Sequence, residues 1–257
     1  MNGYCPLASG SKGNSIFVGT KNSRILIDAG ISAKATQEKL QLIGVDLQTI
    51  DAILITHEHV DHIRGLQSIA LKYNIPVFAN SDTARAILET MDEHPSFKIF
   101  STGETFEFGD LEIHPFSIQH DTLDPVAFTI QSSDLKLGFC TDLGFITTLV
   151  KTHLKNCDYL YIEANHEPAM VHASSRPMIY KQRVLSRQGH LSNQQCAELI
   201  QEIAHPKLRH IHLAHLSEEC NHPQKALDTV QASLNTLALS IDLSIAYQHE
   251  ISKPIYF

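Results

Sequence analysis

The sequence predicts an α+β fold in which two mixed β-sheets pack face to face and helices cover their outer faces. Three observations favour this fold class. Short apolar strands alternate with helix-like segments in the first and last thirds of the chain, and two hairpin patterns lie between them. With 257 residues, of which 43% are hydrophobic, the chain is long enough to enclose a sizeable core. We therefore expect a single domain that spans residues 1–257.

The first third of the chain alternates between predicted strands and helices. Two strands are expected on either side of the glycine-containing turn Ser9–Ser15. Apolar runs bounded by turn residues predict three further strands, at residues 24–28, 52–56 and 76–79. Helices are expected after them, at residues 32–43, 62–73 and 81–91. The first of these helices has clear end signals, because Ser32 can cap its start and Gly44 can end it.

The middle and the last third complete the pattern. Two hairpins are expected, one joining residues 105–108 to 111–114 and the other joining 126–131 to 135–140. A strand at 158–162 then precedes a stretch that we expect to be rich in loops. The remaining predicted elements are a helix at 192–203, a strand at 209–213, a helix at 223–237 and a strand at 242–246. Ser192 and Gln195 form a capping box at the start of the first of these helices.

The composition argues against several classes of protein. With 28 acidic and 20 basic residues the net charge is −8, which does not fit a generally basic surface for nucleic acid, although a local basic patch remains compatible with it. Five scattered cysteines without a C-x-x-C pair indicate reduced, buried thiols. We find no signal peptide, and no apolar run approaches the ~18 residues of a membrane span. We therefore expect a cytoplasmic protein that has no membrane partner.

The densest group of chemically active side chains is the segment Thr56–His62, directly after a predicted strand. Its candidate ligands are three imidazoles and one carboxylate, from His57, His59, Asp61 and His62. As packing elements these groups would each need a buried partner, whereas as metal ligands they are explained together. Imidazole and carboxylate suit zinc, iron or manganese. The segment therefore predicts metal ligands, and its last two side chains are placed to reach a second ion.

Three further candidate ligands, His120, Asp142 and His215, each follow an apolar strand-like segment. Taken alone, each is equally well explained as a polar residue that faces water at the end of a strand. Together with the first segment they indicate one metal centre, because neighbouring strands display their end residues at one rim of a sheet. A pair of ions at such a rim would lower the pKa of a bridging water and supply hydroxide at neutral pH.

The order of these ligands, H-x-H-x-D-H followed by His, Asp and His, resembles the metallo-β-lactamase superfamily over nearly the whole chain. The resemblance implies the αββα sandwich of that superfamily, with two divalent ions (Zn, Mn or Fe) at the sheet edge. By this resemblance the first ion is held by His57, His59 and His120, and the second by Asp61, His62 and His215, with Asp142 bridging. Asp28, at the end of its strand, matches the structural aspartate behind the site.

Four flanking motifs resemble the YycJ (WalJ, VicX) subfamily of bacterial cytoplasmic metallo-hydrolases. They are the turn Ser9–Ser15 and the segments Glu163–Glu167, Gly189–Asn193 and His215–Asn221. The resemblance implies exonuclease action on double-stranded DNA from the 5′ end, and hence a nucleic acid, with DNA favoured, as the substrate. The short span between Asp142 and His215 leaves no room for the large inserted domain of the DNA-repair and messenger-RNA-processing nucleases.

Further roles follow from the chemistry that a phosphodiester requires. Asp61 is expected to orient the attacking hydroxide or to take its proton. By its resemblance to the Glu/His pair of related nucleases, His190 is the candidate general acid for the leaving oxygen, and Glu163 is expected to orient it; the alternative is that His190 merely precedes a capped helix. The candidate substrate contacts are Arg183, Arg187, Ser217, Asn221 and His166. The two arginines belong to the stretch 168–197, which has no acidic residue and offers a possible phosphate-binding rim or an ordinary solvated surface.

Two other functions remain open at this point. The same metal centre can hydrolyse a small ester, thioester or lactone, which a closed apolar pocket would favour. A non-catalytic accessory or signalling protein on this fold is the third possibility, and the complete ligand set speaks against it. The sequence decides neither the metal, nor DNA against RNA, nor strand polarity, nor exo against endo action, nor the oligomeric state.

Overall fold

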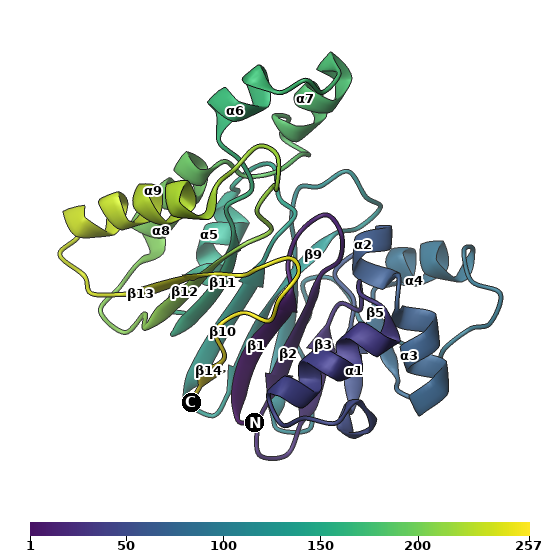
Figure 1. The fold of residues 1–257 in the computed structure, drawn as a ribbon. Coiled ribbons are helices and arrows are strands. Elements are labelled where there is room, and N and C mark those ends of the chain that lie inside the picture. Colours follow the sequence, from purple (N-terminus) through teal and green to yellow (C-terminus); the bar gives the residue numbers. More distant parts are fainter. The chain divides into compact units, whose positions relative to one another are not determined.

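The computed structural model describes residues 1–257, which form two compact units. Unit 1 comprises Met1–Pro115, Thr122–Val126 and Tyr247–Phe257, and unit 2 comprises Phe116–Asp121 and Ala127–Ala246. Each unit is built on a mixed β-sheet with helices against it (Figure 1). The predicted α+β class is confirmed by these two seven-stranded sheets.

The sheet of unit 1 has the strand order β14-β1-β2-β3-β4-β5-β6. Its strands are β1 (Gly3–Ala8), β2 (Ser15–Gly19), β3 (Arg24–Ile27), β4 (Ala52–Leu54), β5 (Val77–Ala79), β6 (Phe97–Ile99) and β14 (Ile255–Tyr256). Its helices are α1 (Ala33–Leu42), η1 (Leu47–Thr49), α2 (Val60–Ile63), α3 (Leu66–Tyr73) and α4 (Ser81–Leu88). Leu40 of α1 and Leu66 of α3 pack on Leu26 and Ile53 of the central strands, which are completely buried. This burial explains why the strands read as unbroken apolar runs.

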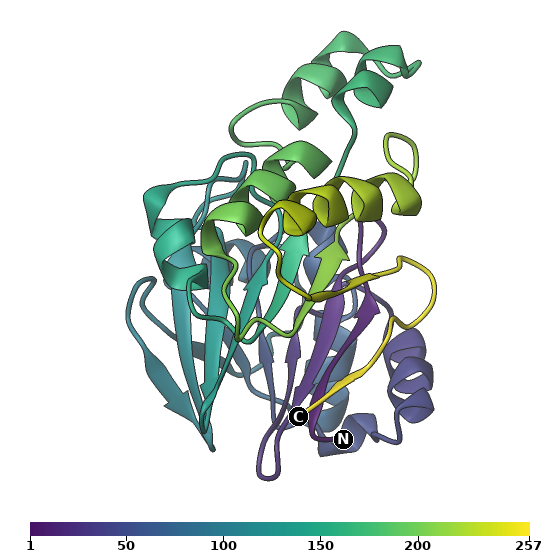
Figure 2. The same ribbon diagram turned by 90° about the vertical axis from the view of Figure 1, so that its left-hand side faces the viewer.

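The second sheet has the order β13-β12-β11-β10-β9-β8-β7. Its strands are β7 (Phe106–Phe108), β8 (Leu111–Ser117), β9 (Val126–Ser132), β10 (Leu135–Cys140), β11 (Tyr159–Glu163), β12 (His210–Ala214) and β13 (Asp242–Ile245). The helices of unit 2 are α5 (Thr148–Leu154), α6 (Pro168–Ala173), α7 (Met178–Val184), α8 (Asn193–Ile203) and α9 (Pro223–Thr236). Figures 1 and 2 show α8 and α9 side by side on the sheet, where Ile200 and Val230 join one core with Leu160 and Ile211.

Parallel pairing places several strand ends at the same edge within each unit. In unit 1, β3 pairs in parallel with β4. In unit 2, β10, β11 and β12 pair in parallel in that order. Because parallel strands share a direction, the residues that follow them emerge at one edge, and the candidate ligands are among these residues.

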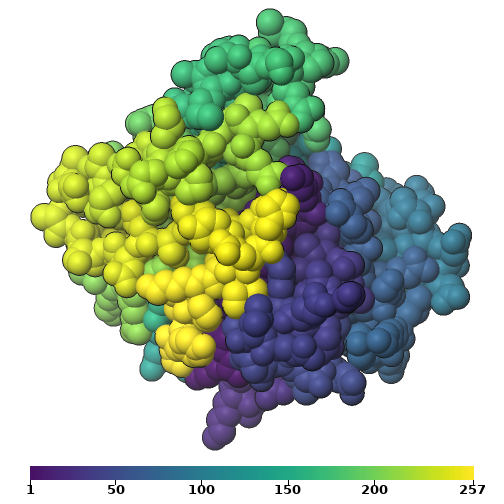
Figure 3. Space-filling view, viewed as in Figure 1, coloured from purple at the N-terminus to yellow at the C-terminus, as the bar shows by residue number.

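The chain ends of unit 1 meet on its surface. β14 pairs antiparallel with β1, and the amide of Asn2 donates a hydrogen bond to the carbonyl of Phe257 (2.8 Å). In the space-filling view of Figure 3 the yellow end of the chain lies beside purple residues from its beginning. None of the helices has the length and hydrophobicity that a membrane-spanning segment needs.

The helix expected at residues 62–73 is in fact two helices, α2 and α3, separated at Gly65. The nitrogen of Gly65 donates a hydrogen bond to the carbonyl of Ala29 (2.8 Å). A Cβ atom on Gly65 would lie 2.0 Å from the carbonyl oxygen of Ile31, so this close backbone approach requires glycine. The apolar period of the sequence continued through the break and concealed it.

The stretch after β11, expected to be rich in loops, contains the short helices α6 and α7, and the sequence analysis also missed α5, β6 and β14. Pro168 opens α6 at a position that proline favours. The helix α7 exposes Met178 and Ile179, with 68% and 78% of their surface accessible, and Val184 is its one buried residue. Both helices stand away from α8 and α9 in Figures 1 and 2.

Candidate metal centre

In unit 1 the segment Thr56–His62 continues from β4 and is held by Asp28, which follows the neighbouring strand β3. The Asp28 carboxylate accepts hydrogen bonds from the backbone nitrogen of Thr56 (2.9 Å) and from Nδ1 of His62 (2.8 Å). The ring centroids of His57 and His62 lie 4.0 Å apart, and those of His57 and His59 lie 4.8 Å apart. Asp28 therefore fixes the segment in the way expected of the structural aspartate.

The structure adds Asn14, which the sequence analysis did not single out. Its amide nitrogen lies 3.1 Å from Oδ2 of Asp61 and 3.0 Å from Nε2 of His62, and its backbone nitrogen donates to the Asp61 carbonyl (2.7 Å). The turn Ser9–Ser15 thus positions the Asp61–His62 pair. The motif itself was visible in the sequence, but nothing in it revealed that its asparagine contacts residues far along the chain.

In unit 2 four side chains form a compact cluster at the ends of the strands. The ligand atoms of Asp142, Glu163, His190 and His215 all lie within 4.8 Å of one another. His120, which follows β8, lies beside this cluster with its Nε2 atom 3.9 Å from Oδ1 of Asp142. These residues come from the ends of several strands, as predicted, and from the loop that precedes α8.

Glu163 is the centre of this cluster and is fully buried. One carboxylate oxygen accepts from Nδ1 of His190 (2.8 Å) and of His215 (3.0 Å), and the other accepts from the backbone nitrogens of Leu143 and Leu191 (3.1 Å each). Burial alone would raise the pKa of Glu163, but the charges and hydrogen bonds of His190 and His215 outweigh it and hold the pKa well below its usual range. Glu163 is therefore an anion that orients both imidazoles.

The histidines share an arrangement that suits metal ligation. In His57, His62, His120 and His215 the Nδ1 atom faces an oxygen, respectively Thr56 Oγ1, Asp28 Oδ2, the Gly189 carbonyl and Glu163 Oε1, at 2.8–3.2 Å. A proton on Nδ1 leaves the lone pair on Nε2, and this is the usual support behind a metal-binding histidine. Each unit therefore offers imidazole and carboxylate donors of the kind that first-row divalent ions take.

Three of the side chains sit on backbone of the left-handed region. The φ angles are +60° at Asp28, +60° at Asp142 and +54° at His215, and all three residues follow parallel strands. Non-glycine residues rarely adopt this conformation. It turns the chain sharply at the strand end, and such strain is typical of functional sites.

The candidate substrate residues differ in what they contact. Arg183 forms an ion pair with Asp121, so a phosphate would have to compete with that carboxylate. The amide of Asn221 is buried and donates to the carbonyls of Ala164 and Asn165 (2.9 and 3.1 Å). The Ser217 hydroxyl accepts from the nitrogen of Cys220 (3.0 Å). These contacts give each residue a structural task, and its part in substrate binding stays a prediction.

The remaining two candidates are Arg187 and His166. The guanidinium of Arg187 lies 3.8 Å from the centre of the Phe145 ring. His166 is buried, and its Nδ1 atom has no hydrogen-bond partner. Burial lowers the pKa of His166 to about 4.

Comparison with known proteins identifies the family. Residues 23–213 match the family described as beta-lactamase superfamily domain. Exodeoxyribonuclease YycJ of Bacillus anthracis is 36% identical over 233 residues, which make up 90% of this chain and 88% of the relative. Exodeoxyribonuclease WalJ of Streptococcus pneumoniae is 34% identical over 252 residues, 94% of this chain and 92% of the relative.

A solved structure agrees on the fold. The metallo-beta-lactamase fold protein YhfI from Bacillus subtilis superposes with a TM-score of 0.71 at 14% identity, covering 96% of this chain and 97% of that one. At this identity the likeness concerns the fold alone. The chain therefore belongs to the beta-lactamase superfamily and, within it, to the family of the exodeoxyribonucleases YycJ and WalJ.

Proposed function

We propose that this protein is a metal-dependent phosphodiesterase that degrades DNA from the 5′ end. The observation that carries the proposal is the Glu163-centred cluster, which joins a ligand set of buried imidazoles and carboxylates to a histidine placed as a proton donor. Relatives named exodeoxyribonuclease over most of the chain support the choice of DNA.

The proposed ligands are those implied by the family resemblance: His57, His59 and His120 for one ion, and Asp61, His62 and His215 for the other, with Asp142 bridging. Two bound divalent ions would supply a nucleophile at neutral pH and neutralise charge on the attacked phosphate. In our proposal Asp61 takes up or directs the proton of the attacking water, and Asn14 holds the Asp61 carboxylate in place by its hydrogen bond (3.1 Å).

His190 protonates the leaving 3′-oxygen in this proposal. It is partly exposed, with 19% of its side chain accessible, so it can reach a substrate, whereas its partner Glu163 is fully buried. The hydrogen bond from its Nδ1 to Glu163 holds the ring in one orientation, as a group that donates a proton to a leaving oxygen requires.

We also propose that residues 1–257 work as one domain in the cytoplasm. All five cysteines are free and buried, which suits a reducing compartment.

The test uses purified protein, 5′-phosphorylated linear duplex DNA and Mn²⁺. We expect stepwise loss of nucleotides from one end, which disappears with a chelator and in Asp61→Ala. Asp82→Ala is the matched control, because this aspartate lies on α4 and pairs only with Arg85 at an exposed position. Degradation that survives in Asp61→Ala would contradict the proposal. No degradation by protein that holds two ions per chain would favour hydrolysis of a small ester, thioester or lactone instead.

A further inference from the structure

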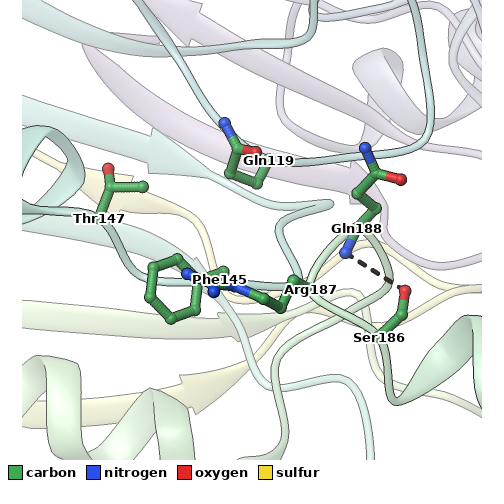
Figure 4. A pocket seen from close by; sticks show the side chains of 6 residues that line it. All are labelled: Gln119, Phe145, Thr147, Ser186, Arg187 and Gln188. Atoms are coloured by element: carbon green, nitrogen blue, oxygen red, sulfur yellow. Dashed lines mark hydrogen bonds between the residues drawn. The ribbon is translucent and has the colours of Figure 1, made fainter.

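A cavity in unit 2 lies outside the set of proposed metal ligands. Its volume is about 430 Å³, and its lining residues are Gln119, Phe145, Thr147, Ser186, Arg187 and Gln188 (Figure 4). This volume lies in the range of ~300–1,000 Å³ that is typical of small-molecule pockets. The lining combines one aromatic ring, one cation, two amides and two hydroxyls, and it contains no carboxylate.

The cavity is built from the same segments as the Glu163 cluster. Gln119 directly precedes His120, Phe145 follows closely after Asp142, and Gln188 shortly precedes His190. The backbone ties these segments together, because the nitrogen of Gly144 donates to the Gln119 carbonyl (3.0 Å) and the Gly189 carbonyl lies 3.2 Å from Nδ1 of His120. A molecule in the cavity would therefore lie next to the candidate catalytic residues.

Arg187 differs from the other arginines of the acid-free stretch. Arg176 pairs with Glu219 and Arg183 pairs with Asp121, whereas Arg187 forms no ion pair. Its guanidinium lies over the ring of Phe145 at 3.8 Å, and Figure 4 shows the two groups side by side at the cavity. Phe145 is 36% exposed, although a ring of this size is normally buried. A guanidinium and an aromatic ring are the two kinds of surface on which unpaired bases stack.

The amides complete a site for a base. Gln119 and Gln188 are exposed, and each side chain offers both a donor and an acceptor. In Figure 4 they lie near the Phe145–Arg187 pair, and the hydroxyl of Ser186 accepts from the backbone nitrogen of Gln188 (3.2 Å). Groups that both donate and accept can bond the edge of any base, so they suit a nuclease without sequence preference.

We propose that this cavity binds one unpaired nucleotide of the DNA strand, at the position next to the bond that is cleaved. The base stacks on the Phe145–Arg187 pair, the two amides bond its edge, and the outer N–H groups of Arg187 donate to the adjacent phosphate. This inference rests on the proposed nuclease function and adds that the end of the duplex is opened by at least one base pair before cleavage.

The first experiment compares KM and kcat for 5′-phosphorylated duplex DNA among variants. Phe145→Leu and Arg187→Gln should each raise KM by roughly 5- to 100-fold, the scale of one lost base stack, and change kcat little. Phe145→Tyr keeps the ring and should restore most of the affinity. Arg176→Gln is the matched control, because this arginine belongs to the same stretch but is paired with Glu219. Unchanged KM in both Phe145→Leu and Arg187→Gln would overturn the inference.

A second experiment removes the base instead of the side chain. A duplex whose terminal nucleotide is abasic should show the same rise in KM with the wild-type protein. With Phe145→Leu the abasic end should cause little further rise, because the stacking partner is already gone. If the rise in KM caused by the abasic end is as large in Phe145→Leu as in the wild type, the terminal base binds elsewhere. That result would contradict the proposal.

A binding measurement separates this inference from the nuclease function. The protein is titrated with dAMP and with deoxyribose 5-phosphate, and calorimetry measures the heat of binding. This measurement needs no turnover. Tighter binding of dAMP that is lost in Phe145→Leu would support the nucleotide site even if no DNA is degraded. Degradation of DNA by protein in which dAMP binds no better than the sugar phosphate would refute the site and leave the nuclease function standing.

Discussion

At the scale of single residues, Glu163 joins the side chains and loops of the cluster in unit 2. This buried carboxylate accepts hydrogen bonds from two imidazoles and two backbone nitrogens, which belong to the residue after β12 and to the loops after β10 and before α8. Removing its charge would leave several buried donors without their acceptor, which is costly in a protein interior. Glu163 therefore couples the orientation of His190 to that of His215.

The proposed proton-donor role of His190 leads to a first prediction. His190→Gln should lower kcat for DNA by about 10²- to 10⁴-fold, the usual contribution of a general acid, with bound metal unchanged. Glu163→Gln should lower kcat as well, because a neutral amide holds the imidazole of His190 less firmly than the carboxylate does. His172→Gln, at an exposed position on α6, is the control and should behave as wild type. Full kcat in His190→Gln would show that another group donates the proton.

His166 gives a prediction about pH. Burial lowers the pKa of its imidazole to about 4, so the folded protein keeps it neutral while the unfolded chain takes up a proton below about 6.5. Stability should therefore fall as the pH is lowered from 6.5 to 4, by on the order of 2 kcal/mol from this group.

Urea unfolding of chelator-treated protein at several pH values measures the effect of His166. The fall in the free energy of unfolding should be smaller in His166→Gln, in which this proton uptake is absent. Equal pH dependence in the two proteins would mean that His166 is not the group responsible.

At the scale of elements, the strands that carry the site were predictable and their supports were not. Apolar runs ending in His or Asp marked β4, β10 and β12, and the order of those end residues matched a known family. Asn14 escaped because its contacts with Asp61 and His62 depend on which turn folds against which loop. The helices α6 and α7 escaped because short, exposed helices bury too little to impose an apolar period on the sequence.

The close packing of the turns leads to a prediction about Gly30, which follows Asp28 and Ala29 at the end of β3. A Cβ atom there would lie 1.6 Å from the carbonyl oxygen of Asp61, the same oxygen that accepts from the nitrogen of Asn14. Gly30→Ala should destabilise the protein by about 2–4 kcal/mol and lower activity, because Asp61 must move.

Gly44→Ala is the comparison, since nothing lies near its added Cβ and only the φ of +69° opposes the change. We expect a loss of about 1 kcal/mol there, with activity retained. Urea unfolding and the DNA assay measure both variants. Similar losses of stability and activity at the two positions would show that the loop around Asp61 rearranges at little cost in free energy.

At the scale of the whole molecule, the chain passes from unit 1 to unit 2 twice and returns each time. The segment Tyr247–Phe257 belongs to unit 1, where the nitrogen of Ser252 donates to the carbonyl of Pro6 (3.0 Å) and β14 pairs with β1. Unit 1 is therefore complete only with the last residues of the chain. This connectivity supports the proposal that residues 1–257 fold as one domain.

The cysteines test that proposal directly, because Cys5 lies in unit 1 and the other four lie in unit 2. All are buried, and burial raises the pKa of Cys5 and of Cys157 to about 12, so the folded thiols should resist a thiol reagent. If the chain unfolds as one domain, all five thiols should become reactive over the same range of urea concentration. The signal that is lost in the variant Cys5→Ala is the signal of unit 1. A separate transition for Cys5 would show that the units unfold independently.

The left-handed backbone at Asp28, Asp142 and His215 has a consequence for protein engineering. At these three positions the main chain alone would favour glycine, whereas the chemistry requires a carboxylate or an imidazole. A library selected only for stability will tend to replace these residues with glycine. It will therefore accumulate variants that are stable but inactive. If the proposed metal centre is correct, improving this protein while keeping it active means holding these residues constant and searching for gains elsewhere.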